Sequence, residues 1–107
     1  MAFADLALRR CSIRKYSGRP VGQRKLDQVL EAARVAPTAK NMQPWRVHAL
    51  RSPEALAAFD ELTTMRFGAP VVLVFTYDVD EDWKNPLEEG IHSGQQDASI
   101  AATHAML

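Results

Sequence analysis

The chain has 107 residues, with 13 basic and 13 acidic side chains and therefore a formal net charge of zero. This length supports one domain and excludes two independent cores, and a hydrophobic content of 47% excludes an intrinsically disordered chain. The longest apolar run, residues 69–75, is far shorter than the ~20 residues that span a bilayer, and the N-terminus carries an acid where a secretory leader carries bases. We therefore expect a cytoplasmic protein without a membrane segment.

The zero net charge hides a division between the two halves of the chain. Residues 1–51 hold eleven Lys and Arg against three acids, a sum of +8, and residues 52–107 hold two bases against ten acids, a sum of −8. Such asymmetry favours an anionic ligand for the first half. Mutual attraction of the halves, or charges spread over solvated faces, explains the same numbers.

The first half of the chain predicts two helices separated by an irregular segment. Good helix formers over residues 2–9 predict a short helix, and Ser, Gly and Pro punctuate residues 11–21. Apolar residues over 23–35 follow i, i+3, i+4, i+7 spacing, which predicts an amphipathic helix that Pro37 stops. Residues 37–44 are short and polar, as in a loop.

The second half predicts two strands and two further helices. Residues 45–50 alternate as a half-buried strand does, and Ser52-Pro53-Glu54 is a helix start that leads to about residue 64. The apolar run 71–75 suits a strand buried on both faces. Residues 78–89 are an acidic loop, and residues 95–107 form a helix. Because that helix has no terminal cap and two strands make a poor sheet, we expect a partial domain or a chain that folds against a partner.

The first candidate site is the basic string Arg9-Arg10-Cys11-Ser12-Ile13-Arg14-Lys15. Guanidinium groups form paired, charge-assisted bonds with phosphate oxygens, and a serine adds a neutral donor. In an extended segment alternate residues point the same way, so Arg10, Ser12 and Arg14 would face one ligand while Cys11 and Ile13 face the core. A solvated basic surface is the alternative interpretation.

The second candidate site is the string from Pro37 to Trp45, in which two prolines bracket hydroxyl and amide side chains before a strand. The amides of Asn41 and Gln43 each offer a donor and an acceptor, which suits the edge of a planar heterocycle. The alternative is a simple connection in which Asn41 caps a turn and Trp45 packs.

Together the two strings resemble the nitroreductase family of FMN-dependent oxidoreductases, over the whole chain. The resemblance implies an α+β fold with helices around a central sheet, and an intertwined homodimer with two FMN molecules at its interface. Arg10 and Ser12 would hold the phosphate, Arg14 would reach the ribityl chain and the pyrimidine edge, and Thr38, Ala39 and Asn41 would meet the flavin from the other subunit. Cys11 completes the cofactor-binding set, Thr38 stands where serine is more usual, and no catalytic side chain or metal ligand is assigned.

The implied activity is transfer of hydride from NAD(P)H through FMN to a nitroaromatic, quinone or similar acceptor, by ping-pong turnover. Family members run to roughly twice this length, so residues 1–107 resemble a partial FMN-binding domain whose C-terminal half is absent. The alternative functions are a non-catalytic FMN- or phosphate-binding module, or an inactive fragment of such an enzyme. A nucleic-acid binder is disfavoured, because the basic string lacks interleaved aromatic residues.

Three further features predict no site. Asp78-Val79-Asp80-Glu81-Asp82 resembles the start of a calcium loop, but Trp83 stands where that loop requires glycine. The histidines at 48, 92 and 104 lack metal-ligand spacing, and we expect them to be surface or structural residues. Cys11 has no nearby histidine that could activate it as a nucleophile.

Overall fold

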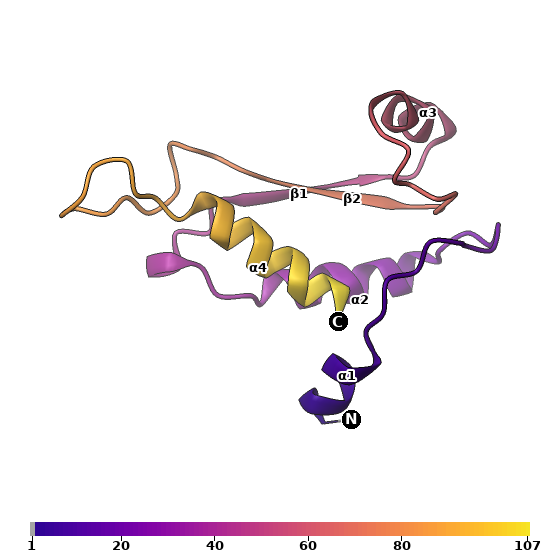
Figure 1. Cartoon of the computed structure of the whole chain (residues 1–107), viewed down its shortest axis with the longest axis horizontal. Helices are drawn as coiled ribbons and strands as arrows, with labels where there is room; N and C mark the ends of the chain where they lie inside the picture. Colours follow the sequence, from indigo (N-terminus) through magenta and orange to yellow (C-terminus); the bar gives the residue numbers. More distant parts are fainter. Residues whose placement is uncertain (1) are drawn as a thin grey trace.

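The computed structural model describes residues 2–107 as an α+β chain, as the sequence predicts. Every predicted helix and strand is present, with ends within two residues of the expected ones. In chain order the elements are α1 (Phe3–Arg9), α2 (Gln23–Arg34), the short 3-10 helix η1 (Ala39–Asn41), β1 (Trp45–Leu50), α3 (Pro53–Leu62), β2 (Val72–Tyr77) and α4 (Gly94–Met106) (Figure 1).

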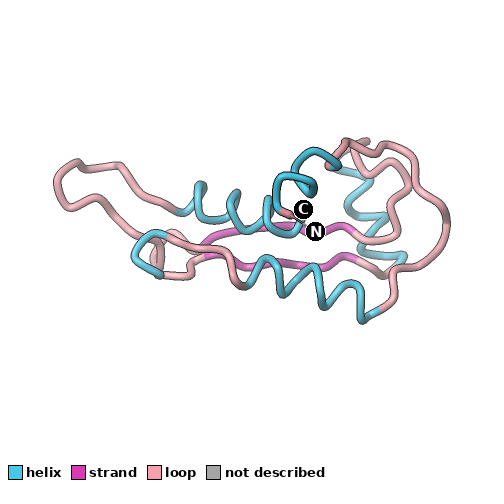
Figure 2. Tube along the Cα trace, turned by 90° about the horizontal axis from the view of Figure 1, so that it is seen from below, coloured by secondary structure: helices cyan, strands magenta, loops and turns pink. Residues whose placement is uncertain are grey.

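The two strands form an antiparallel pair at the centre of the molecule (Figure 2). The register runs from Trp45 opposite Tyr77 to Leu50 opposite Val72. The rings of Trp45 and Phe75 lie 5.9 Å apart, a diagonal aromatic pair of the kind that stabilises a sheet. The predicted alternation holds at the start of β1, where Trp45 and Val47 are half-buried while the residues after each are exposed.

The core lies between the sheet and two helices on one side of it. α4 packs along both strands and α2 packs against α4 (Figure 1). Ala33 of α2 and Ala101 of α4 are fully buried, and such small side chains allow two helices to approach closely. His104 Nδ1 lies 3.2 Å from the carbonyl oxygen of Ala32 and joins the two helices by a hydrogen bond.

The expectation that the apolar strand is buried on both faces is wrong for this chain. Residues 72–75 are half-buried throughout. The reason is that α2 and α4 lie on one side of the sheet, whereas α3 sits at the end where β1 finishes and does not cover the other face (Figure 1).

The described chain is flatter and more open than a self-contained domain of its size. Its accessible surface is 8041 Å², against the roughly 6,000 Å² that area scaling predicts for this mass. The radius of gyration is 15.8 Å, against about 13 Å for a compact domain of this length. Large apolar side chains such as Leu8, Leu62 and Leu87 are more than four-fifths exposed. The chain thus leaves much apolar surface uncovered.

The start of α3 follows the predicted capping pattern. Ser52 is the N-cap residue, and its side-chain oxygen accepts a hydrogen bond of 3.1 Å from the amide of Ala55. Pro53 takes the first helical position and Glu54 lies in the first turn. Among the described helices, none has the length and apolar character that crossing a membrane requires.

Candidate functional site

The basic string begins at the last residue of α1, and all of its residues are exposed. Arg10 has extended backbone angles, φ −60° and ψ 130°, and residues 10–16 belong to neither a helix nor a strand. Across the described chain, Arg34, Arg46 and Arg66 each pair with an acid, but none of the four cations of the string makes a salt bridge. These cations and Ser12 are therefore free to bind an external anion.

The expectation that Cys11 and Ile13 face the core is wrong. Both side chains are exposed, Ile13 by 55%. The alternation of an extended segment creates a buried side only where another element packs against it, and every residue from Arg10 to Pro20 is exposed in this chain.

The proline-bracketed segment forms a tight turn with an unusual backbone. Lys40, Asn41 and Gln43 all have left-handed φ angles of 52–53°, which cost energy for residues other than glycine. The amide of Gln43 donates to the hydroxyl of Thr38 at 3.0 Å. Thr38, a predicted site residue, therefore also closes the turn. Pro44 is fully buried and accepts a hydrogen bond from the Asp78 amide, which ties the end of the turn to the segment after β2.

A carboxylate from α4 holds the beginning of this turn. Asp97 is only 2% exposed, and its Oδ1 accepts a hydrogen bond of 3.0 Å from the amide of Ala39. Its Oδ2 accepts a second bond of 2.6 Å from the hydroxyl of Ser93. Asp97 was not among the predicted site residues; its signal in the sequence is an acid that shares a helical face with the apolar residues Ala98 and Ala101.

The turn also borders an open cavity of about 390 Å³. Thr38 and Ala39 line it from one side, and Trp83, His92 and Ile100 line it with other residues of the loop and α4. The cavity is therefore built from two segments that are far apart in the sequence.

The structure does not bring the two predicted groups of site residues together within one chain. The basic string continues from the end of α1, whereas Thr38, Ala39 and Asn41 belong to the turn that contains η1. These two regions lie well apart along the longest axis of the molecule in both views (Figures 1 and 2). Within one chain the two groups therefore lie in separate regions of the molecule.

The acidic loop after β2 is organised around a buried carboxylate. Asp82 is 3% exposed, and its Oδ2 lies 2.5 Å from His92 Nδ1 and 2.9 Å from the amide of Gly94. Its Oδ1 pairs with the Lys84 ammonium group. Hydrogen bonding from Lys84 is the main cause that lowers the pKa of Asp82 to about 2, with His92 and the Gly94 amide adding to the effect and burial opposing it.

This pKa predicts loss of stability in acid. A carboxyl group has a pKa of about 3.9 in an unfolded chain, so the lower folded value contributes stability that is fully present above about pH 4 and lost as the pH falls towards 2. Urea unfolding between about pH 5 and pH 2 should show a steeper loss for the wild type than for Asp82→Asn. Equal pH dependence in the two proteins would show that Asp82 is not the group responsible.

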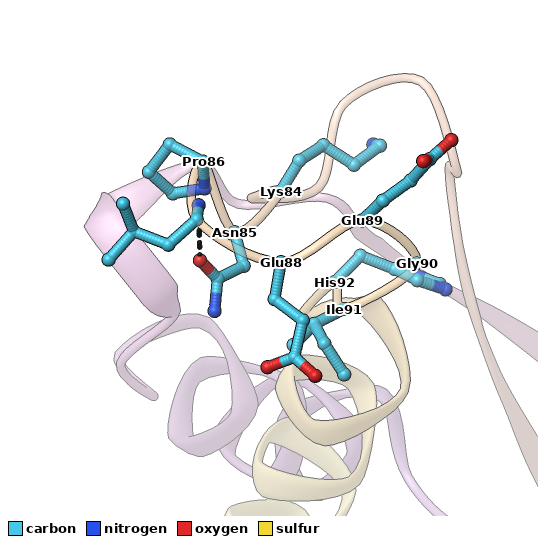
Figure 3. A pocket seen from close by; sticks show the side chains of 9 residues that line it. Lys84, Asn85, Pro86, Glu88, Glu89, Gly90, Ile91 and His92 are labelled. Atoms are coloured by element: carbon cyan, nitrogen blue, oxygen red, sulfur yellow. Dashed lines mark hydrogen bonds between the residues drawn. The ribbon is translucent and has the colours of Figure 1, made fainter.

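Residues 84–92 form a projecting loop that encloses a separate hollow of about 570 Å³ (Figure 3). The Leu87 amide donates to Asn85 Oδ1 at 2.8 Å, and the side chains of Glu88 and Ile91 point to the same side (Figure 3). This hollow contains none of the predicted site residues, and one contiguous loop lines all of it.

The family model described as "Nitroreductase family" matches residues 7–67. An NADH dehydrogenase from Thermus thermophilus is 45% identical over 96 residues, covering 84% of this chain and 45% of that protein. An FMN reductase [NAD(P)H] from Bacillus subtilis is 33% identical over 105 residues, covering 84% and 42%. The chain thus spans about half the length of the relatives it matches.

Solved structures agree with the family match. The crystal structure of a nitroreductase family protein from Clostridium difficile 630 superposes with a TM-score of 0.93 at 34% identity, covering 99% of this chain and 60% of that one. An FMN-dependent nitroreductase from Clostridium difficile R20291 gives a TM-score of 0.72 at 31% identity, covering 91% and 54%. The chain belongs to the nitroreductase family, which confirms the resemblance and the fold class predicted from its sequence.

Proposed function

We propose that this protein is part of an FMN-dependent oxidoreductase that takes hydride from NAD(P)H and passes it to a nitroaromatic, quinone or similar small acceptor. Two similar proteins, the FMN reductase [NAD(P)H] from Bacillus subtilis and the FMN-dependent nitroreductase from Clostridium difficile R20291, support this class of activity. The observation that carries the proposal is the exposed cationic string after α1, whose side chains have no acidic partner among the described residues.

The residues of the string fit a phosphate dianion. Arg10 and Ser12 lie two positions apart on an extended segment, so their side chains can converge on one group from the same side. An arginine offers a planar fork of donors that matches two phosphate oxygens, and a serine hydroxyl fills a third position. Cys11 is exposed between them and belongs to the same proposed contact set.

The other residues of the set would come from a second copy of the chain. In this proposal Thr38, Ala39 and Asn41 of the partner meet the ring system, since the turn that contains η1 lies well apart from the string within one chain (Figure 1). Large apolar side chains such as Leu8 and Leu62 are exposed, and burying such side chains at a homodimer interface would be favourable.

FMN, when bound, supplies the hydride chemistry, and the protein supplies position and electrostatics. Arg14 is two residues beyond Ser12 on the same side, where it would reach the ribityl chain and the pyrimidine edge of the ring. A fixed cation at that edge stabilises negative charge there, a preorganised electrostatic effect that needs no side-chain acid.

Titration with FMN and with riboflavin tests the proposal. Riboflavin has the same ring but lacks the phosphate, so FMN should bind at least about tenfold more tightly, as charged hydrogen bonds to phosphate predict. Oxidation of NAD(P)H in the presence of FMN and a quinone then separates the enzyme from a non-catalytic FMN-binding module, which would bind without turnover. Equal affinity for both flavins would contradict the proposed phosphate site.

A further inference from the structure

Asp97 uses both of its oxygens inside the protein. One oxygen accepts from the Ala39 amide at 3.0 Å, and the other accepts from the Ser93 hydroxyl at 2.6 Å. Ala39 lies 58 residues away in the sequence, so this bond joins two segments that no local structure would bring together. Among the described hydrogen bonds, it is the one that ties the turn to α4.

The backbone conformation of the turn that this bond anchors is one that its residues do not favour by themselves. Three of its residues, Lys40, Asn41 and Gln43, have left-handed φ angles, and such conformations persist only where surrounding contacts fix them. The Asn41 amide bonds to the Thr38 carbonyl and the Gln43 amide to the Thr38 hydroxyl, but both of these bonds lie within the turn. Attachment to α4 therefore depends on Asp97.

The carboxylate itself is held in place. Ser93 Oγ donates to Asp97 and accepts a bond of 3.2 Å from the Trp83 amide, while the Ser93 amide donates to the Trp83 carbonyl at 2.9 Å. The carboxylate that accepts from the Ala39 amide is thus also fixed through its other oxygen. Ser93 and Asp97 are both buried, which strengthens the hydrogen bond between them.

We propose that Asp97 is the positioning residue of this site: it presents Thr38, Ala39 and Asn41 in the conformation in which they contact the flavin of the partner subunit. This inference rests on the proposed function, in which those three residues meet the ring. Asp97 does not itself touch the cofactor; it acts through the Ala39 amide.

Two variants and a control test the proposal in the 107-residue chain. Asp97→Asn keeps an oxygen for the Ala39 amide, and Ser93 can turn its hydroxyl to accept from the new amide group. Asp97→Ala removes the acceptor and leaves the Ala39 amide without its partner. Gln95→Ala removes an exposed polar side chain from the same helix, whereas the hydrogen bond from the turn to that helix goes to Asp97.

Amide hydrogen exchange and FMN titration provide the readouts. In the wild type without cofactor, the Ala39 amide should exchange slowly, and in Asp97→Ala it should exchange at least about tenfold faster, in line with a lost buried hydrogen bond. FMN affinity should fall about tenfold in Asp97→Ala and stay within about threefold of the wild type in Asp97→Asn and Gln95→Ala.

The outcomes separate this inference from the proposed function. Fast exchange at Ala39 in the wild type, or equal loss of FMN affinity in the Asn and Ala variants, would overturn the role of Asp97. If Asp97→Ala does not fold, the exchange rate of the Ala39 amide in the wild type and the FMN affinity of Asp97→Asn still test the role of Asp97. Absence of FMN binding in the wild type would instead overturn the proposed function, and with it the role for the turn, even where Ala39 is protected.

Discussion

Replacing Arg10 with alanine should weaken FMN binding by about 1.5–3 kcal/mol, or roughly 10- to 150-fold, the size of a hydrogen bond to a charged group. The physical reason is that the exposed Arg10 guanidinium has no acidic partner within the described chain, so its donors are available to the phosphate. Fluorescence titration of the wild type and Arg10→Ala measures the change.

Two controls make the Arg10 experiment specific. Arg9→Ala removes a neighbouring cation from the last turn of α1, and it should change FMN affinity by less than about threefold, since a nearby but uncoordinated charge contributes little in water. Riboflavin should bind Arg10→Ala and the wild type equally, because it has no phosphate. Unchanged FMN affinity in Arg10→Ala would show that Arg10 does not bind the phosphate.

Replacing Gly94 with alanine should destabilise the folded chain by about 1–3 kcal/mol, the usual cost of overpacking. Gly94 is the buried first residue of α4, and a Cβ there would overlap the ring of Tyr77 and lie 2.7 Å from Asp82 Oδ2. The ring also lies near His92, with centroids 6.1 Å apart, so a displacement of the ring would change that contact. Urea unfolding monitored by circular dichroism measures the loss.

Gly18→Ala is the matched control for Gly94. No atom lies within 4 Å of the position that a Cβ would take at Gly18, so this substitution should change the free energy of unfolding by less than about 0.5 kcal/mol. Adding Tyr77→Ala to Gly94→Ala should cost less than the sum of the two single changes, because the overlap is then absent. A Gly94→Ala protein as stable as the wild type would show that α4 can shift without cost.

The elements could be predicted from the sequence because each has a local signal. The spacing of apolar residues defines α2, alternation defines β1, and Ser52-Pro53-Glu54 places the start of α3. Side-chain burial was harder to predict, because it depends on what packs against an element. Cys11 and Ile13 alternate in the expected way, yet no other element covers them.

The contacts that hold the candidate site could not be predicted from local patterns. Asp97 accepts a hydrogen bond from the Ala39 amide, which lies 58 residues away in the sequence. Asp82 belongs to a run of acids in the sequence, but in the fold it binds Lys84, His92 and the Gly94 amide. Both carboxylates accept a hydrogen bond from the start of α4, Asp97 from Ser93 and Asp82 from Gly94. Such partners become visible only in the fold.

A crystal structure of the protein with FMN bound is the most direct test of the account. It should show the phosphate held by Arg10 and Ser12 of one chain, with the ring system against Thr38 and Asn41 of the partner subunit. A phosphate bound elsewhere, with Arg10 and Arg14 in solvent, would contradict the account.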